Sequence, residues 1–473
     1  MYAENMTGML SRSIMKFLLL LSTCMFSPVL QSQVWEQIYG DGMKNEGRSL
    51  QITSDGGFIL LGYTYAASNG SADVLLIKTD EYGDEEWSQT YDDFMNNGVY
   101  DNTDDKGYFV QETSDGGFIV VGSTTEEGED SEDGGLDILM LKTGPDGETE
   151  WTKVLGYPNN DVAWAVRQTS DGGYAIAGYT VTSPWDIEGD FKELYLIKTD
   201  ENGNEEWSQT FGTDEMTAIG YSLEQTDDGG FIIGGLLGPG RKIQNNTSAD
   251  AYLIKTDASG TELWSQTYGG DYFDIGYSVQ QTEDGGFILL GFMSYSIVWA
   301  DRDIYLIKTD ENGSEEWSQT FGDADTREMG HSVEQTMDGG YIIGGTRNHG
   351  LQSFGDSDML LIKTTETGAE EWTQTFESTI HHDDSGHAVR RTADGCYVLL
   401  GATATSNAEE SDAYLIKTCE GGAQSASFLS AHPGNRKLVK VVDIMGREVN
   451  PAPNEILFYI YNDGTIEQKF VYE

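Results

Sequence analysis

The sequence predicts an all-β protein, a closed seven-bladed β-propeller followed by a small C-terminal β domain. Three observations predict it: an internal repeat of about 56 residues, four short strand-like segments in each repeat, and one spare strand at the N-terminal end. An Asp-Gly-Gly turn marks each repeat and becomes Asp-Gly-Cys in the last copy. The aspartates of these turns are Asp55, Asp115, Asp171, Asp228, Asp284, Asp338 and Asp394.

Each repeat contains four short strands, a to d, separated by turn signals. Around Asp228, the segment SLEQT precedes the turn and the apolar segment FIIGG follows it. A third segment ends in Lys-Thr, and in six repeats a tryptophan stands nine residues after that lysine. No segment shows helical periodicity, and four strands repeated at this period are typical of a propeller blade.

Seven sets of strands a to c are followed by only six d strands. The seventh stands at the other end of the chain, where residues 34–40 (VWEQIYG) match the d-strand pattern EEWSQTYG. We expect this N-terminal strand to complete the last blade, which would close the ring and remove an exposed sheet edge. The predicted propeller spans residues 33–422.

The repeated lysine and tryptophan have a structural role in this interpretation. A three-residue loop between strands c and d, with its glycine in the left-handed region, sets Lys198 opposite Glu206. Four other repeats keep this pair, whereas Lys255 meets Leu263. A two-residue turn would instead place each lysine over its tryptophan. Either arrangement makes these residues part of the scaffold.

Two cysteines depart from the repeat at neighbouring positions of the seventh blade. Cys396 replaces the second glycine of the turn, and Cys419 replaces the aspartate that follows Lys-Thr. We predict a disulfide between them, which would stabilise the fold by about 3 kcal/mol on the chain-entropy model. The alternative is two unrelated free thiols.

The composition excludes two classes of protein. Asp and Glu number 80 against 27 Lys and Arg, which gives a formal net charge of −53 and would repel a nucleic acid. Aromatic residues make up 11% of the chain, too many for a disordered acidic tail. High net charge suits solubility or a saline habitat.

Residues 1–32 are predicted to be a signal peptide whose true start is Met15. Arg12 and Lys16 precede the apolar run 17–21, and small residues lie near a cleavage point after Ser32. This run is too short to span a bilayer, so we expect no membrane span. The alternative is lipoprotein processing at Cys24.

A linker at residues 423–435 precedes a short module at residues 436–473. Residues 440–449 (KVVDIMGREV), followed by an apolar strand, an Asn-Asp-Gly turn and a final strand, closely resemble the C-terminal sorting domain of the type IX (Por) secretion system. The resemblance implies a Bacteroidota-like bacterium, type IX secretion machinery as a partner, and either release or attachment at the outer-membrane surface. The blades are similar to Gln-Thr-x-Asp-Gly-Gly repeat propellers, a group without a well-defined activity. Taken without the resemblance, the module is a generic β domain.

One position near the start of strand a varies between repeats and carries large polar or aromatic side chains. Its residues are Arg48, Tyr108, Trp164, Tyr221, Tyr277, His331 and His387. If this end of the strand lies at the channel mouth, they form a ring suited to stacking on sugar rings or planar groups. The alternative is rim packing between blades. Three residues further along strand a stands a second set of polar residues, whose side chains either line a polar channel or pair with one another: Gln51, Gln111, Arg167, Glu224, Gln280, Glu334 and Arg390.

A weaker signal suggests a metal site. The run His381, His382, Asp383 and Asp384, with His387, offers nitrogen and oxygen ligands for a transition metal. Calcium is a second candidate, because the loops are rich in Asp and Asn, although no segment matches a complete calcium loop. No cofactor is firmly indicated.

These features predict a monomeric, secreted or cell-surface propeller that recognises a polysaccharide or protein through its variable-loop face, without catalysis. The alternative is a carbohydrate-active (glycoside hydrolase-like) or metal-dependent enzyme with its site at the channel mouth, near His331 and His387. A purely structural surface-layer role comes third. The sequence contains no nucleophile elbow, phosphate loop or zinc-protease motif.

Overall fold

The computed structural model divides the chain into two compact units, residues 1–422 and residues 423–473. In the first unit it describes residues 35–40, 44–65, 71–92, 103–125, 135–157, 159–181, 191–212, 216–239, 248–296, 301–323, 326–349, 357–378, 383–404 and 411–419, and in the second residues 438–442, 456–461 and 466–470. The signal-peptide prediction, Cys24, the linker, His381 and His382 lie outside these ranges. Every named element in the described ranges is a strand, so the all-β prediction is confirmed.

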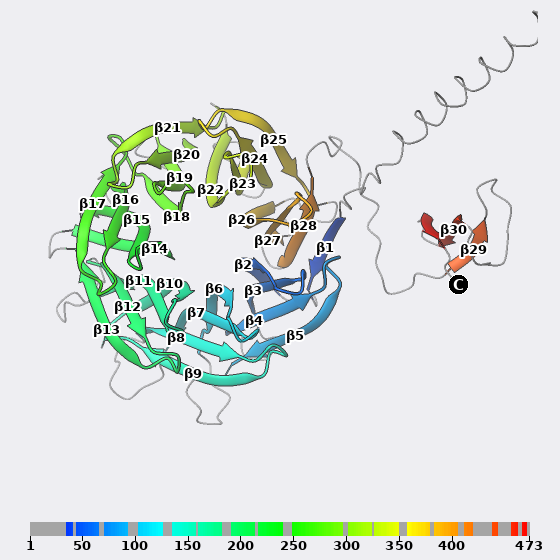
Figure 1. Cartoon of the computed structure of the whole chain (residues 1–473), viewed down its shortest axis with the longest axis horizontal. Helices are drawn as coiled ribbons and strands as arrows, with labels where there is room; N and C mark the ends of the chain where they lie inside the picture. The colour runs from blue at the N-terminus through cyan, green and yellow to red at the C-terminus, as the bar shows by residue number, and fades with distance from the viewer. Residues whose placement is uncertain are drawn as a thin grey trace, which may run out of the picture. The chain divides into compact units, whose positions relative to one another are not determined.

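The described strands of the first unit form four antiparallel sheets of four strands and one sheet of 12 strands (Figure 1). In the 12-stranded sheet, single parallel pairings of Arg302 with Arg327 and of Ser357 with Asp383 join three further antiparallel sets of four. Each set of four strands is called a blade. Blade 1 holds β2 (Asn45–Ile52), β3 (Phe58–Tyr65), β4 (Ala72–Thr79) and β5 (Glu85–Tyr91); blade 2 holds β6 (Lys106–Glu112), β7 (Phe118–Thr125), β8 (Leu136–Thr143) and β9 (Thr149–Leu155); blade 3 holds β10 (Asp161–Gln168), β11 (Tyr174–Thr180), β12 (Glu193–Thr199) and β13 (Glu205–Phe211); blade 4 holds β14 (Met216–Gln225), β15 (Phe231–Pro239), β16 (Asp250–Thr256) and β17 (Glu262–Tyr268). Blade 5 holds β18 (Ile275–Gln281), β19 (Phe287–Ser294), β20 (Arg302–Thr309) and β21 (Glu315–Phe321); blade 6 holds β22 (Thr326–Gln335), β23 (Tyr341–His349), β24 (Ser357–Thr364) and β25 (Glu370–Phe376); blade 7 holds β26 (Asp383–Arg391), β27 (Tyr397–Ala404) and β28 (Ser411–Thr418).

The fourth strand of blade 7 comes from the N-terminal end of the chain. β1 (Trp35–Tyr39) pairs antiparallel with β28, with Trp35 opposite Lys417. β2 of blade 1 in turn contacts β26 and β27 of blade 7. Figure 1 shows the blades arranged radially, with the first strand of each nearest the centre. This is a β-propeller architecture built from repeats.

The blades are joined by an aromatic contact that recurs around the structure. Trp87 of blade 1 packs against Phe118 of blade 2 at 6.0 Å between ring centroids. Equivalent contacts at 5.8–6.1 Å join Trp35–Phe58, Trp151–Tyr174, Trp207–Phe231, Trp264–Phe287, Trp317–Tyr341 and Trp372–Tyr397. Buried aliphatic residues of adjacent blades, such as Leu61 and Val120, fill the space beneath. The tryptophan of the repeat is therefore an inter-blade core residue, as expected for scaffold.

The repeated lysine is buried and held by two carboxylates. Lys198 Nζ lies 3.0 Å from Asp171 Oδ2 and 3.0 Å from Glu206 Oε2, and donates to the Thr199 carbonyl. The predicted lysine–glutamate pair occurs in all five repeats that carry it: Lys78–Glu86, Lys142–Glu150, Lys198–Glu206, Lys308–Glu316 and Lys363–Glu371. The aspartate belongs to the Asp-Gly-Gly turn, and its part in the pair was not foreseen from the sequence. It also holds Lys255, the lysine without a glutamate.

The loop between the third and fourth strands has the predicted left-handed glycine, with φ of 74° at Gly203. The expected register is wrong by one residue. A bulge after Lys198 sets its backbone opposite Trp207, while the lysine side chain still reaches Glu206. The ion pair and the bulge therefore coexist, because the long side chain spans the one-residue shift.

The predicted disulfide in blade 7 is confirmed. Cys396 and Cys419 are bonded, with their Cα atoms 4.3 Å apart. In blade 1 the position of Cys396 is Gly57, where a Cβ would lie 2.1 Å from the Thr79 carbonyl oxygen. The two backbones thus approach closely at this position, which favours glycine in blade 1 and brings the two cysteines of blade 7 within bonding distance.

The second unit contains β29 (Leu438–Val442), β30 (Ile456–Tyr461) and β31 (Ile466–Phe470) in one antiparallel sheet. Within the described part of the chain, no helix has the length and apolar character needed to cross a membrane.

Candidate functional site

A β-bulge in the innermost strand of each blade positions the candidate ring. In β18, Gly276 pairs with Gly291 and Ser278 pairs with Leu290, so Tyr277 is left out of the ladder. The residue omitted by the corresponding bulges of the other blades is Arg48, Tyr108, Trp164, Tyr221, His331 or His387. A bulge re-aims the side chain of its extra residue. All seven ring residues therefore leave the ladder at the same point of their strands.

Small residues make this bulge possible. A Cβ on Gly276 would lie 2.8 Å from Leu289 Cδ1, and a Cβ on Gly291 would lie 1.7 Å from the Ile275 carbonyl oxygen. Glycine precedes the ring residue in six blades, and Ala163 takes this place in blade 3. This Gly-x signal was present in the sequence and could have identified the bulge.

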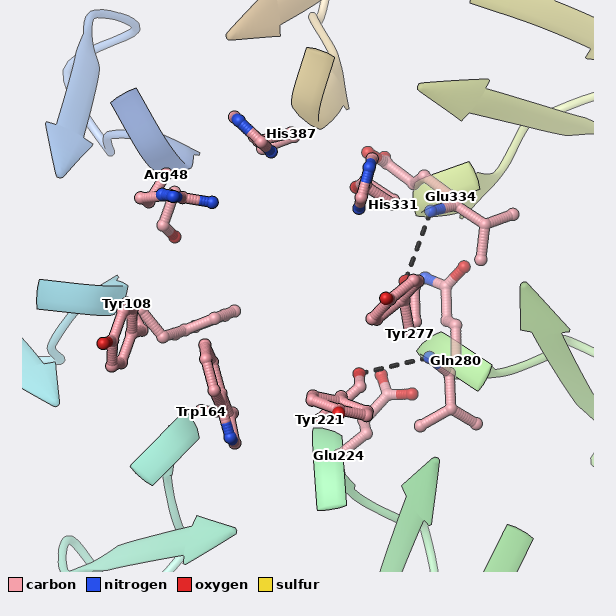
Figure 2. A pocket seen from close by; sticks show the side chains of 18 of the residues that line it. Arg48, Tyr108, Trp164, Tyr221, Glu224, Tyr277, Gln280, His331, Glu334 and His387 are labelled. Atoms are coloured by element: carbon pink, nitrogen blue, oxygen red, sulfur yellow. Dashed lines mark hydrogen bonds between the residues drawn. The ribbon is translucent and has the colours of Figure 1, made fainter. Parts of the chain in front are cut away.

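The ring residues surround one cavity of about 550 Å³. Figure 2 shows the ring residues, each of them labelled, around a central opening. Each is half-buried, so part of every side chain is exposed to the cavity. The structure thus brings together all seven residues that the sequence analysis singled out, at the centre of the propeller.

Six of the seven form an unbroken series of ring contacts. Their centroids are 4.3 Å apart for Tyr108–Trp164, 5.6 Å for Trp164–Tyr221, 5.2 Å for Tyr221–Tyr277, 5.2 Å for Tyr277–His331 and 5.3 Å for His331–His387. The planes are tilted or edge-on, the geometry that aromatic quadrupoles favour. These six side chains therefore pack against one another between blades and also present a surface to the cavity.

The seventh member, Arg48, is fixed at the gap in that series. Its Nη2 donates to Glu46 Oε2 at 2.6 Å and to the Tyr63 hydroxyl at 2.9 Å. Burial alone would lower the pKa of Arg48, but Tyr63 and Glu46 raise it overall. Arg48 is thus a paired, immobilised cation beside the aromatic series.

The two histidines are neutral near pH 7. Burial, with a smaller contribution from Arg48, lowers the pKa of His331 to about 4. Burial, Arg48 and then His331 hold the pKa of His387 well below its usual value. His387 Nε2 also lies 3.1 Å from Ser385 Oγ. Both imidazoles therefore act as uncharged rings, each with a nitrogen that can accept a proton or a hydrogen bond.

The second polar set lies three residues further along each strand, and all its members except Gln111 line the same cavity. Several bridge neighbouring blades by accepting a backbone N–H. Glu224 accepts from Gln281 at 2.6 Å, and Glu334 accepts from Arg391 at 3.1 Å. The first predicted role, lining the channel, holds for six members of the set. The second, pairing with one another, takes the form of contacts between a side chain of one blade and the backbone of the next.

The candidate metal residues within the described ranges have separate partners. Asp383 accepts a hydrogen bond from Ser357, and buried Asp384 accepts from the Ser378 amide, whereas His387 belongs to the ring. Among the described residues, no three His, Cys, Asp or Glu side chains are placed to hold a metal ion. His381 and His382 lie outside those residues.

No protein-family model and no curated protein matches the chain. Solved structures resemble it in fold. An ulvan lyase, a polysaccharide lyase bound to a saccharide of glucuronic acid and rhamnose 3-sulfate, matches with a TM-score of 0.50 and 10% identity over 80% of this chain and 95% of that chain. A second ulvan lyase structure gives a TM-score of 0.51 at 9% identity, with the same coverage. The β-propeller domain of the Trilobed protease from Pyrococcus furiosus matches at 10% identity over 81% of this chain and 95% of that domain, with a TM-score of 0.43. Identity this low shows likeness of fold alone.

Proposed function

We propose that this chain is a secreted or cell-surface β-propeller that binds an extracellular ligand, a polysaccharide or a protein, at its central cavity without catalysis. The observation that carries the proposal is the convergence of the seven bulge residues on one cavity. A scaffold needs only the repeating residues, yet this position varies between blades and is aromatic or imidazole in six of them. Rigid aromatic faces bordered by hydrogen-bonding groups suit sugar rings. We therefore favour a saccharide.

We infer that the blades form a closed seven-bladed ring around this cavity. The Trp35–Phe58 contact supports closure, because it repeats between the last and first blades the contact that joins every other adjacent pair. Closure through β1 would make the cavity wall continuous and rigid. The ring residues would then be pre-organised before any ligand arrives.

We also propose that the chain is exported. The predicted signal peptide, and the resemblance of residues 436–473 to a type IX sorting domain, support passage through the outer membrane by that machinery. An extracellular ligand is consistent with this route.

An enzyme acting at the same place is the second candidate. The adjacent neutral imidazoles of His331 and His387 favour it, since an uncharged imidazole can serve as a general base. A carbohydrate-active, glycoside hydrolase-like or metal-dependent enzyme would use this part of the cavity mouth.

Titration calorimetry of the full chain against a panel of extracellular oligosaccharides tests the proposal, with each mixture then analysed by mass spectrometry for cleavage. We expect one class of saccharide to bind intact. The variant Trp164→Ala should weaken binding about 10-fold or more, because it removes a stacking face. The control Tyr82→Ala, which removes an exposed aromatic residue in a turn between the third and fourth strands, should bind like wild type. Cleavage would make the chain an enzyme, and absence of binding across the panel would reject the saccharide site.

A further inference from the structure

The cavity contains two arginines whose charge is not neutralised by a direct carboxylate contact. Arg167 Nη1 donates to the Val166 carbonyl at 2.9 Å, and Arg390 Nη1 donates to the Val389 carbonyl at 2.7 Å and to Ser332 Oγ at 3.2 Å. Both side chains line the cavity and are half-buried. Within the described residues, neither guanidinium has a carboxylate oxygen within 4.0 Å. Each therefore keeps N–H donors available to a ligand.

In the described part of the chain, neither cation has a carboxylate in direct contact, and Arg167 lies instead over the Phe109 ring, 4.3 Å from its centroid. Burial lowers the pKa of Arg167 to about 10, a shift that Glu224 opposes and to which Arg390 makes a smaller contribution. Burial likewise lowers the pKa of Arg390, against the effect of Glu334. A cation kept in a partly dehydrated site without a direct counter-ion costs stability. The chain has a formal charge of −53 and so contains many carboxylates, yet among the described residues none contacts either arginine.

The charges of the cavity lie on two different arcs. Arg390 belongs to blade 7, Arg48 and Gln51 to blade 1, and Arg167 to blade 3. The carboxylates of Glu224 and Glu334 belong to blades 4 and 6. Figure 2 shows Arg48 and these two glutamates on opposite sides of the opening. The neutral rings of His331 and His387 add no charge to either side.

Both glutamates are already engaged by backbone amides, as described above. Gln51 also faces the cavity, and no partner of its side-chain amide occurs among the described residues. The arc of Arg390, Arg48, Gln51 and Arg167 is therefore rich in donors, whereas blades 4 and 6, next to Arg167 and Arg390, carry the acceptors Glu224 and Glu334. A ligand with an anionic group on one edge and hydroxyls on the other matches this polarity.

We propose that the arc formed by Arg48, Gln51, Arg167 and Arg390 binds the oxyanion, a carboxylate or sulfate, of an acidic saccharide whose sugar ring lies against the aromatic series. This inference rests on the proposed saccharide function and narrows it to acidic saccharides. The planar guanidinium of Arg167 or Arg390 can receive such a group through two parallel N–H···O bonds.

The test is calorimetric titration of the full chain with three matched probes: a hexuronate oligosaccharide, the same oligosaccharide with its carboxyl groups reduced, and a sulfated oligosaccharide. We expect the reduced probe to bind about 10-fold or more weakly than the hexuronate. The relative affinities of the uronate and sulfated probes identify which oxyanion is recognised. Equal affinity for the acidic and reduced probes would overturn the proposal.

The variants Arg167→Met and Arg390→Met separate a ligand-binding role from a structural one. Each should lose about 10-fold or more in affinity for the acidic probe, yet melt at the same or a higher temperature without ligand, because an unpaired cation has been removed. Arg391→Met is the matched control: its side chain does not line the cavity, and its binding should equal that of wild type. A lowered melting temperature in both cavity variants, with unchanged affinity, would assign the arginines to the scaffold and reject the site.

Inorganic sulfate and free glucuronate distinguish this proposal from the proposed function. If no oligosaccharide binds but these small anions raise the melting temperature of wild type and not of Arg167→Met, the oxyanion site stands and the saccharide function fails. If only the neutral oligosaccharide binds, the saccharide function stands and the oxyanion site fails. If neither small anion nor acidic oligosaccharide binds, the oxyanion site is rejected.

Discussion

The indole of Trp35 lies over Gly83, so closely that a Cβ on Gly83 would come within 2.7 Å of the ring. Trp35 belongs to the N-terminal strand of blade 7, and Gly83 to the last turn of blade 1, where φ is 80°. Blades 2 to 6 repeat the contact: Trp87–Gly147, Trp151–Gly203, Trp207–Gly260, Trp264–Gly313 and Trp317–Gly368. These glycines are required twice, by their left-handed backbone and by the neighbouring tryptophan. β1 is therefore attached to blade 1 as well as to its own blade.

Removal of the Trp35 side chain should weaken this attachment. Trp35→Ala leaves a cavity against Phe58 and Gly83, and we expect the free energy of unfolding to fall by about 3 kcal/mol. Guanidinium denaturation of the full chain, followed by tryptophan fluorescence and circular dichroism, measures the loss. The control Tyr82→Ala removes a neighbouring aromatic side chain that is 51% exposed, and should change stability little. Equal stability of both variants and wild type would show that β1 is not needed to hold blade 7 to blade 1.

The glycines opposite the bulge should tolerate no side chain. A Cβ on Gly62 would lie 1.7 Å from the Glu46 carbonyl oxygen, so the bulge that aims Arg48 cannot form unchanged in Gly62→Ala. We expect a loss of more than about 2 kcal/mol in stability. Gly270→Ala is the matched control, because nothing lies within 4 Å of its Cβ and its φ is not in the left-handed region. A neutral Gly62→Ala would mean that the bulge is not sterically enforced.

The sequence predicted most of the fold because its signals are local and repeated. The period of the Asp-Gly-Gly turn, the spare strand at Trp35 and the paired cysteines each have one simple structural solution. The partner of Lys198 in the turn, Asp171, was missed because 27 residues separate them and no pairing rule connects strand c to that turn. The ring residues were found as departures from the repeat.

The orientation of the seven ring residues could not be predicted from the sequence, for a physical reason. A bulge shifts the alternation of inward and outward side chains by one, so the two-residue period alone gives the wrong face. The unpaired state of Arg167 and Arg390 depends on distances between blades, which no local pattern encodes. The variable loops carry no repeating signal at all.

Asp161 should make the protein less stable as the pH rises. Its carboxyl is fully buried, and burial raises its pKa to about 6, although Thr180 and the Tyr157 amide oppose the shift. The folded state therefore holds a proton that the unfolded chain releases near pH 4, and this stabilisation is lost as the pH rises through 6. Relative to wild type, the free energy of unfolding of Asp161→Asn should rise by up to about 3 kcal/mol between pH 4 and pH 7.5.

Denaturation of both proteins at several pH values measures this difference. Asp171→Asn is the contrasting control, because the hydrogen bond from Thr169, aided by Lys198 and the Gly173 amide, lowers the pKa of its carboxyl against burial. The ionised Asp171 carboxylate stabilises the fold above about pH 4, and this stabilisation is lost in acid. The free energy of unfolding of Asp171→Asn should therefore fall relative to that of wild type as the pH rises. The same slope in both variants would contradict the assigned environments.

His331 should produce a dependence opposite to that of Asp161. Its folded pKa of about 4 lies below the ordinary 6.5, because burial and then Arg48 disfavour the imidazolium. As the pH falls through 6.5 the unfolded chain binds a proton that the folded chain does not, so stability decreases until about pH 4. His331→Gln removes this proton linkage and keeps a planar polar group at the cavity. We expect its stability, relative to wild type, to be constant above pH 7.5 and to rise by about 2 kcal/mol at pH 4.5, a value reduced for contact with water in the cavity. A relative stability that does not change across this range would show that His331 can be protonated where it lies, and the ring would then carry positive charge near pH 6.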